Sequence, residues 1–305
     1  MGMKHHYSLR KIAAALSCIF IASVTFAGTS LTANAAATSI TRISGNTRYE
    51  TMGMVSRASF ISAPPSKDAV LAYGTDFPDA LAAYSLAGHL NAPILLTDPK
   101  SLSNETANEL NRLDANAIFV IGGNKAVSHN VENEIRATHP SATITRLTGS
   151  TRFDTAHSIY NELATLGAKP QTAIISTGFN FADALSISPY SYMQSAPFFL
   201  SSQSGLDEAS LNTLRNFQTA IIVGGEQAVP TSVEQQLKSI GVSTVRIQGT
   251  TRYETSLEIG KFTLNNLSLD PSSVVYATGA NFPDALSGSA LAGINKTVLL
   301  LAQND

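Results

Sequence analysis

Blocks of sequence recur along this chain of 305 residues at a nearly constant spacing. The first block reads RISGNTRYET at 42–51, RLTGSTRFDT at 146–155 and RIQGTTRYET at 246–255. The second reads GTDFPDAL at 74–81, GFNFADAL at 178–185 and GANFPDAL at 279–286. Successive copies of both blocks lie about 100 residues apart. Repeating units of that length are whole domains rather than the short rungs of a solenoid.

A third block occurs in only two copies, IFVIGGNKAV at 118–127 and AIIVGGEQAV at 220–229. We therefore predict a short N-terminal segment at 36–41, followed by repeats at 42–145, 146–245 and 246–305, of which the third is incomplete. A parallel sheet that lacks the strand of this block has an unpaired edge. We expect that edge near Val298–Leu301.

Apolar runs alternate with helix-like stretches inside each unit. In the first unit we predict strands at 69–73, 93–97 and 117–121, and helices near 48–60, 79–90, 103–113 and 128–138. This alternation is typical of βαβ units around a parallel sheet. The fold class is therefore α/β, with three Rossmann-like parallel-sheet repeats. Capping boxes are predicted at Thr47…Glu50, Thr151…Asp154, Thr251…Glu254 and Thr231…Glu234.

The first 35 residues have the pattern of a signal peptide. A basic start precedes an apolar run at 12–28, and Ala33-Asn34-Ala35 forms a small-residue cleavage site. The run is too short for an ordinary membrane span, so we expect an exported chain without one after cleavage. Cleavage there removes the only cysteine, Cys18, and with it any disulfide. A lipobox ending at Cys18 is the alternative.

Composition narrows the class of partner. Hydrophobic residues make up 44% of the chain and charged residues 14%, which indicates packed cores rather than disorder. The formal net charge is −2 and becomes more negative once the basic leader is removed. General nucleic-acid binders carry a basic excess, so a nucleic-acid partner is not expected.

Arginine occupies two positions of the first block in every copy. These residues are Arg42, Arg48, Arg146, Arg152, Arg246 and Arg252. The planar guanidinium group suits bidentate contact with phosphate or carboxylate, so they are candidate polymer-binding residues. The alternative is an internal ion pair, for example with the acidic residue of the same block, that fixes the loop before the helix.

The other repeated polar positions favour structural roles. Asp79, Asp183 and Asp284 fall where helices begin, where a carboxylate can accept free N–H groups. Gly122, Gly123, Gly224 and Gly225 follow strands and predict tight turns, with anion binding by their backbone N–H groups as the alternative. The block phenylalanines Phe77, Phe181 and Phe282 are predicted core residues.

No enzymatic motif accompanies these blocks. The histidines at 89, 129, 139 and 157 occupy no equivalent positions in the copies. The sequence has no HExxH, no GxSxG, no cysteine pair for zinc and no GxGxxG or P-loop. We therefore expect no catalytic residue, no metal and no cofactor. A nucleophile and base brought together only by folding would escape this search.

With these blocks in this order, the sequence resembles the cell wall binding repeat 2 family of Gram-positive surface proteins. The resemblance spans residues 42–305. It implies three Rossmann-like subdomains in a pseudo-threefold arrangement and non-covalent attachment to anionic wall polymers, such as secondary polysaccharides or teichoic-type polymers. In that family a Pro-Ile-Leu-Leu-Thr segment is linked with polymer attachment. Here that segment is Pro93, Ile94, Leu95, Leu96 and Thr97, with a counterpart at 197–201.

We therefore expect a secreted, non-catalytic protein of the cell wall or cell surface. The first alternative is a modifier subunit or member of a wall-remodelling hydrolase system, associated with an amidase. The second alternative is a small-ligand binder that uses the Gly-Gly turns.

Overall fold

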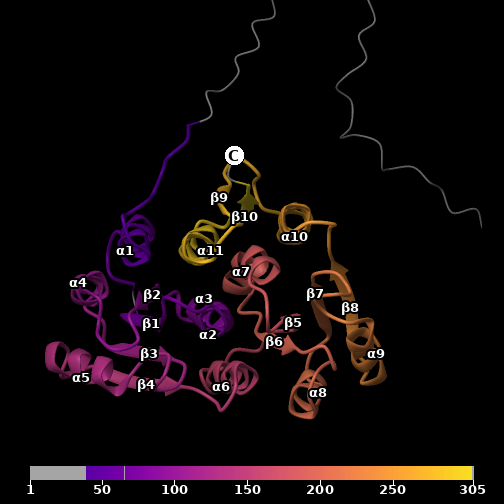
Figure 1. Ribbon diagram of the computed structural model, residues 1–305, viewed down its shortest axis with the longest axis horizontal. Helices are drawn as coiled ribbons and strands as arrows, with labels where there is room; N and C mark the ends of the chain where they lie inside the picture. Colours follow the sequence, from indigo (N-terminus) through magenta and orange to yellow (C-terminus); the bar gives the residue numbers. More distant parts are fainter. Residues whose placement is uncertain (1–38, 65, 304–305) are drawn as a thin grey trace, which may run out of the picture. The chain divides into compact units, whose positions relative to one another are not determined.

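The computed structural model describes residues 39–64 and 66–303, so the predicted signal peptide at 1–35 lies outside the described residues. Residues 42–305 group into one compact unit. Three repeats follow one another in it (Figure 1). No helix in the described part of the chain is long and apolar enough to cross a membrane.

The first two repeats have the same order of helices and strands. Repeat 1 contains α1 (Arg48–Ser59), β1 (Asp68–Tyr73), α2 (Pro78–Ala82), α3 (Tyr84–Leu90), β2 (Ile94–Thr97), α4 (Asn104–Leu113), β3 (Ala117–Ile121), α5 (His129–Thr138) and β4 (Thr143–Leu147). Repeat 2 contains α6 (Arg152–Thr165), β5 (Thr172–Thr177), α7 (Ala182–Gln194), β6 (Phe198–Ser201), α8 (Glu208–Leu214), β7 (Thr219–Val223), α9 (Thr231–Ser239) and β8 (Ser243–Ile247). Repeat 3 contains α10 (Arg252–Leu267), β9 (Val275–Thr278), α11 (Pro283–Ile294) and β10 (Leu299–Ala302).

Every strand pair is parallel, which confirms the predicted fold class. The strand orders are β2-β1-β3-β4 and β6-β5-β7-β8, and the third sheet is β10-β9. The first strand of each complete repeat is therefore central and takes neighbours on both sides. The strands β4 and β8 were not predicted, because their outward positions are polar and they lack the apolar run of a doubly buried strand.

Strand order also corrects the predicted open edge of the third repeat. We expected it near Val298–Leu301, but β10 corresponds to β2, which lies at an edge of its sheet in the complete repeat. Among residues 39–64 and 66–303, the strand that lacks a neighbour found in the other repeats is β9, because its counterparts β1 and β5 also pair with β3 and β7.

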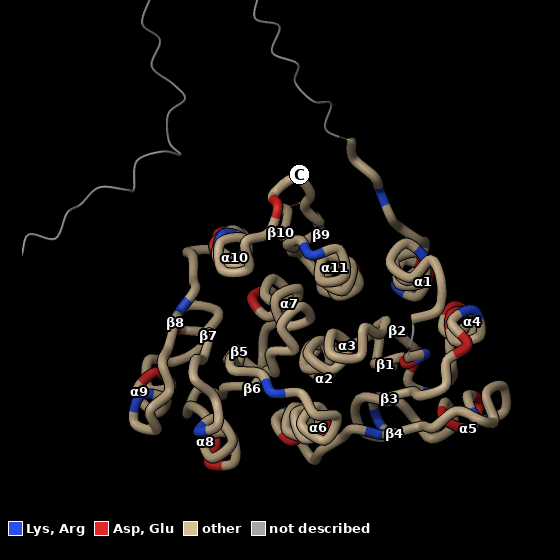
Figure 2. The backbone as a smooth tube through the Cα atoms, turned by 180° about the vertical axis from the view of Figure 1, so that it is seen from behind, with Lys and Arg blue, Asp and Glu red and all other residues tan. Residues whose placement is uncertain are grey.

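The central helices of the three repeats share one core. Figure 1 shows α3, α7 and α11 together in the middle, and each contacts the other two. The largest hydrophobic cluster combines buried residues of all three repeats, including Tyr84, Leu185 and Leu286. Close approach is enforced at Gly88, where an added Cβ would overlap the carbonyl oxygen of Tyr192. Figure 2 shows most charged residues on the outer elements, away from this core.

The first helix of each repeat packs against the central helix of another repeat. Helix α1 contacts α11, α6 contacts α2 and α3, and α10 contacts α7. Each contact is repeated around the unit, which confirms the pseudo-threefold arrangement. It also brings the first sequence block of one repeat beside the second block of another.

The predicted capping boxes differ in detail. Thr47, Thr151 and Thr251 are N-caps whose side chains accept from the backbone three residues on. Only Asp154 completes the box with its own cap residue. The longer Glu50 and Glu254 reach one residue further back, to the N–H of residues 46 and 250. The prediction at Thr231 was wrong, because Pro230 is the N-cap and Thr231 is already helical.

The predicted helix at 79–90 is divided at Ala83. The N–H of Ala83 bonds to the carbonyl of Ala80 at 3.2 Å, a tighter turn than that of an α-helix. The equivalent helices α7 and α11 are continuous.

Candidate functional site

Arg48, Arg152 and Arg252 occupy the first helical positions of α1, α6 and α10. Their Nη1 atoms donate to the carbonyl oxygens of glycines that begin the second sequence block, Gly74, Gly178 and Gly279. The distances at Gly74 and Gly279 are both 2.6 Å. One arginine position of the first block thus fixes the loop that starts the second block of the same repeat.

Two of these guanidinium groups also reach another repeat. The Arg48 guanidinium carbon lies 5.8 Å from the ring centroid of Phe282, and that of Arg252 lies 5.4 Å from Phe181. Arg152 differs, because it lies 5.8 Å from Phe179 in its own repeat. A cation over an aromatic ring is attracted by the negative face of the ring.

Phe77, Phe181 and Phe282 form a triangle between the repeats. Their ring centroids are separated by 5.6, 5.8 and 6.0 Å, the range of edge-to-face and tilted pairs. All three are partly buried against the shared core. The pseudo-threefold axis therefore passes among three equivalent rings, and equivalent arginines contact two of them.

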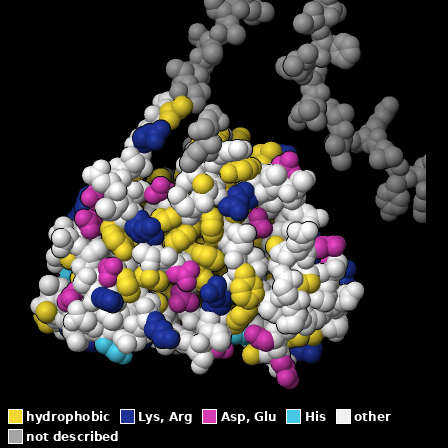
Figure 3. All heavy atoms as spheres, in the orientation of Figure 1, with side chains coloured by type: hydrophobic (Ala, Val, Ile, Leu, Met, Phe, Trp, Pro, Cys, Tyr) yellow, Lys and Arg dark blue, Asp and Glu magenta, His cyan; other side chains and the backbone are white. Residues whose placement is uncertain are grey.

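The space-filling view shows a related pattern on one face of the unit. Hydrophobic side chains gather near the middle of this face, with Lys and Arg side chains around them (Figure 3). Asp and Glu side chains lie among the positive charges on the same face.

Of the remaining first-block arginines, Arg146 and Arg246 are held internally. Arg146 on β4 donates from Nε to Glu132 Oε1 at 2.7 Å and from Nη1 to the Gly122 carbonyl at 2.7 Å. Arg246 on β8 makes the equivalent bonds to Glu234 at 2.7 Å and to Gly224 at 2.8 Å. Their side chains are only 16% and 11% exposed. Their counterpart Arg42 is exposed and lies outside any strand.

The alternative interpretation paired these arginines with the acidic residue of the first block. The acids in the ion pairs are different ones. The acids of the first block accept hydrogen bonds from backbone N–H groups at the helix starts. Arg146 and Arg246 pair with Glu132 on α5 and Glu234 on α9. The sequence analysis missed these glutamates. A repeated Val-Glu pair at 131–132 and 233–234 was the available signal.

Burial raises the pKa of Glu132, but hydrogen bonds and charge from Arg146, together with bonds from Arg136 and His129, outweigh it. The net result is a pKa below the usual value of 4.5. The carboxylate is therefore ionised at neutral pH and forms one centre of a partly buried ion-pair cluster.

The block aspartates lie in the first turns of α2, α7 and α11. Asp79 and Asp183 are half-buried, whereas Asp284 is exposed. The N-cap residues are the block phenylalanines, without a side-chain cap bond. Burial raises the pKa of Asp79 and Asp183, while Arg152 and Arg252 of neighbouring repeats act in the opposite direction.

The Gly-Gly turns are built around these carboxylates. Gly122 and Gly224 have φ values of +96° and +102°. An added Cβ would lie 2.6 Å from Asp79 Oδ2 at the first turn and 2.6 Å from Asp183 Oδ2 at the second. The N–H of each of these glycines donates to a neighbouring strand, to the carbonyls of Leu147 and Ile247. Neither N–H is free for an anion, and the adjacent carboxylate repels one.

The segment from Pro93 to Thr97 lies at an edge of its sheet. Ile94, Leu95, Leu96 and Thr97 form β2, and every residue of the segment is buried. Thr97 Oγ1 donates to the Ser101 carbonyl and accepts from the Ser103 N–H, both at 3.1 Å. These side chains therefore pack in the shared core.

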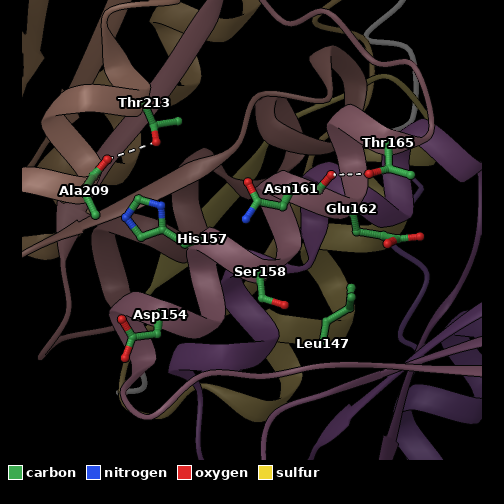
Figure 4. Close-up of a pocket in the computed structure, with 9 residues that line it drawn as sticks. All are labelled: Leu147, Asp154, His157, Ser158, Asn161, Glu162, Thr165, Ala209 and Thr213. Atoms are coloured by element: carbon green, nitrogen blue, oxygen red, sulfur yellow. Dashed lines mark hydrogen bonds between the residues drawn. The ribbon is translucent and has the colours of Figure 1, made fainter.

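A shallow groove of about 570 Å³ lies between α6 and α8 (Figure 4). The hydrogen bonds drawn there, Thr165 to Asn161 and Thr213 to Ala209, each stay within one helix. Near it, His157 Nε2 is 2.9 Å from Ser210 Oγ and 3.8 Å from Asp207 Oδ1.

This serine, histidine and aspartate do not form a catalytic triad. Such a triad holds the acid and the nucleophile on opposite nitrogens of the imidazole. Here both partners approach Nε2, and Ser210 is buried. Within residues 39–64 and 66–303, no cluster of His, Cys, Asp and Glu is suited to a metal ion.

The model of the family "Cell wall binding domain 2 (CWB2)" matches residues 42–132, 146–234 and 246–305. The chain belongs to this family. Its three matched segments each begin at the first arginine of the first block. CWB2 domains are binding modules of the cell wall, which places this chain at the cell wall or cell surface.

Two curated relatives from Bacillus subtilis contain a similar region. N-acetylmuramoyl-L-alanine amidase LytC is 30% identical over 299 residues, which is 97% of this chain and 56% of the relative. The amidase enhancer is 31% identical over 266 residues, which is 87% of this chain and 35% of the relative. The CWB2 chain thus spans about half of one relative and about a third of the other.

Two solved structures from Clostridium difficile have the same fold. Cwp8 is 27% identical with a TM-score of 0.76, covering 85% of this chain and 44% of that one. Cwp6 is 24% identical with a TM-score of 0.77, covering 86% and 41%. The CWB2 repeats of this chain therefore share their fold with these two proteins.

Proposed function

We propose that this chain is an exported, non-catalytic wall-binding protein that attaches non-covalently to an anionic polymer of a Gram-positive cell wall. A secondary polysaccharide or a teichoic-type polymer has the required negative charge. The three CWB2 matches support the binding role. The basic start and cleavage pattern of residues 1–35 support export.

The observation that carries the proposal is the threefold recurrence of half-buried arginines. In the described residues, the bonds of Arg48, Arg152 and Arg252 to glycine carbonyls engage Nη1. The other guanidinium N–H groups remain for charge-assisted bonds to phosphate or carboxylate. Together with exposed Arg42, they are our polymer-contacting residues.

Arg146, Arg246 and the segment from Pro93 to Thr97 have a supporting role in this proposal. The two arginines hold the Gly-Gly turns through internal bonds, and the segment packs an edge strand. Asp79, Asp183 and the turn glycines likewise maintain the geometry of the loops.

Several weak contacts on one rigid unit give avidity without a single strong site. A pull-down with purified walls tests this. The triple variant Arg48→Gln, Arg152→Gln, Arg252→Gln should lose most wall binding. The matched control removes three exposed charges elsewhere, with Lys125→Gln, Lys169→Gln and Lys238→Gln. Equal losses in the two triples, or unchanged binding to walls stripped of anionic polymer, would contradict the proposal.

A role beside a wall hydrolase is the second candidate, because the two curated relatives are named as an amidase and an amidase enhancer. The test is release of wall fragments by a purified amidase with and without this chain. The role is supported if this chain increases fragment release by the amidase more than its triple arginine variant does. Release by the chain alone would indicate catalysis, contrary to the proposal.

The small-ligand alternative has little support from the geometry. The first N–H of each Gly-Gly turn is used in its sheet, and a half-buried carboxylate occupies the space where an anion would lie.

A further inference from the structure

The groove between α6 and α8 lies where repeat 1 has a filled helix interface. In repeat 1 the equivalent helices are α1 and α4. Buried Glu109 of α4 forms ion pairs there with Arg57 at 2.8 Å and with Arg112 at 2.7 Å. When the first blocks at 42 and 146 are aligned, Asn161 stands where repeat 1 has Arg57, and Thr213 stands where it has Glu109. Repeat 2 therefore has uncharged side chains in place of an ion pair.

A second exchange separates the two helices of repeat 2. Gly53 on α1 is buried, and a Cβ added there would lie 3.9 Å from the Cβ of Glu105 on α4. In repeat 2 the position of Gly53 is taken by His157, whose Nε2 lies 2.9 Å from Ser210 Oγ on α8. The imidazole lies between the helices, and α6 and α8 approach each other less closely than α1 and α4 do. The two exchanges together leave the groove of about 570 Å³.

The lining of this groove is polar and without basic side chains. None of the described residues that line it is Lys or Arg, and the polar ones are Asp154, His157, Ser158, Asn161, Glu162, Thr165 and Thr213 (Figure 4). In the described part of the chain, the Ser158 hydroxyl and the Asn161 amide make no hydrogen bond to other protein groups, and both can donate and accept. A ligand rich in hydroxyl groups and without negative charge fits such a lining. A phosphate-bearing chain would meet two carboxylates there.

The groove continues toward exposed aromatic rings. Asp207 Oδ1 lies 3.8 Å from His157 Nε2 and, with Phe153, lines a smaller hollow of about 150 Å³. The other residues of this hollow are Ser202, Ser204, Gly205 and Leu206. Phe179 is 61% exposed, and its ring centroid lies 6.3 Å from that of Phe153. The negative face of an aromatic ring attracts the C–H groups of a sugar ring, so a stacking surface lies at one end of the groove.

We propose that this face of repeat 2 is a second binding site, which takes an uncharged glycan chain. Side chains of α6 and α8 bind its hydroxyl and amide groups, and Phe153 and Phe179 stack against a sugar at its end. A cationic peptide fits less well, because Asp154 already accepts from the N–H and hydroxyl of Thr151 at the start of α6. Glu162 is then the remaining carboxylate of the described lining. A neutral glycan and an anionic polymer bound at separate sites of one unit would add avidity.

The probe is chitotetraose, an uncharged oligomer of N-acetylglucosamine whose hydroxyl and acetamido groups match the lining. Saturation-transfer difference NMR with the purified full chain should show saturable binding with a dissociation constant of about 1 mM or lower. Tetralysine is the cationic probe for comparison and should bind more weakly.

The decisive variant restores the ion pair of repeat 1 with Asn161→Arg and Thr213→Glu, which fills the groove. It should weaken chitotetraose binding about tenfold or more. The matched control, Ser232→Glu with Gln235→Arg, adds the same two charges at exposed positions of α9 and should leave binding unchanged. Asn161→Ala is a smaller change at an exposed helical position, where alanine favours the helix. It should weaken binding about threefold and decides the question if the double variant is unfolded by circular dichroism.

Walls stripped of anionic polymer separate this site from the polymer contacts proposed above. The triple arginine variant should keep the residual binding to stripped walls. The groove-filling variant should lose that residual binding and keep most binding to intact walls.

Three results would overturn the proposal. One is the absence of saturable binding of chitotetraose. Another is equal affinity in the groove variants and the α9 control. The third is tighter binding of tetralysine than of chitotetraose, which would assign the groove to a cationic peptide. None of them changes what the triple arginine variant shows with intact walls, so a failure here is distinguishable from a failure of the proposed function.

Discussion

Single residues of the three blocks connect helices to strand ends through hydrogen bonds and close contacts, which explains why they recur. Each first-block arginine with a described partner holds the carbonyl of a glycine at a strand end, either in the second block or in the third. Each half-buried aspartate in turn limits which residue fits in the Gly-Gly turn. The blocks are far apart in sequence and in direct contact in the fold.

The turn glycines give a prediction with a built-in control. Gly122→Ala should destabilise the protein by about 1–2 kcal/mol for the left-handed backbone and by about 1–3 kcal/mol more for the clash with Asp79. Gly167 has a similar φ of +88°, and nothing lies within 4 Å of a Cβ added there. Gly167→Ala should therefore show only the destabilisation from the left-handed backbone. Urea unfolding measures both. Equal destabilisation would show that the aspartate contact is unimportant.

The ion pair at Glu132 predicts a defined pH dependence. Its pKa is lower in the folded than in the unfolded chain, so its stabilisation is present above the ordinary pKa of 4.5 and is lost as pH falls through the lowered value. Glu132→Gln should therefore reduce the free energy of unfolding at pH 7, and the difference should vanish in strong acid.

The control for this measurement is Glu226→Gln, which removes an exposed acid. It should change the free energy of unfolding little at any pH, because exposed charges contribute little to stability. A Glu132 effect independent of pH would indicate lost packing rather than lost charge.

Among the elements, α7 is unusual because Pro189 lies inside it. Proline has no N–H, so the carbonyl of Leu185 loses its partner within the helix. The Ser289 hydroxyl of α11 has a single proton, which is shared between that oxygen, 3.0 Å from Oγ, and the Ala285 carbonyl, 2.8 Å from Oγ. A break in one helix is thus compensated by the central helix of the next repeat.

This compensation can be measured with a double-mutant cycle. Ser289→Ala should cost about 1 kcal/mol of stability in the natural background, because a buried carbonyl is left unpaired. The same change should cost less beside Pro189→Ala, which restores the helical N–H. Thermal unfolding of the four proteins gives the coupling energy. Additive effects would mean that Ser289 does not serve the proline break.

At the scale of the whole unit, the repeats do not have separate cores. One cluster combines residues of all three repeats, while a second cluster is confined to the outer side of repeat 2. The central helices bury apolar surface against each other and against first helices of other repeats. The repeats should therefore depend on one another for stability.

A fragment containing residues 36–145 tests this dependence. It retains the repeat 1 elements through most of β4 but loses the helices that cover α3. We expect it to lack a cooperative thermal transition, whereas residues 36–305 should unfold with one for the shared core. A fragment that folds as stably as the longer chain would show that the repeats are independent domains.

Much of the element content was predictable from the sequence. Buried strands such as β1 and β3 have continuous apolar runs, and the threonines before α1, α6 and α10 mark helix starts. Both signals are local. The polar strands β4 and β8 were missed, because their positions depend on pairing with β3 and β7 rather than on their own composition.

The sequence by itself determined the threefold repetition, the α/β class and the family, since these follow from periodicity and from blocks at fixed spacing. Only the tertiary structure decided the partners of the arginines and the burial of Pro93–Thr97. These depend on strand order and on contacts between residues far apart in the sequence, such as Tyr84 and Leu286, which are 202 positions apart. Such contacts form only when all three repeats pack together, and no local pattern records them.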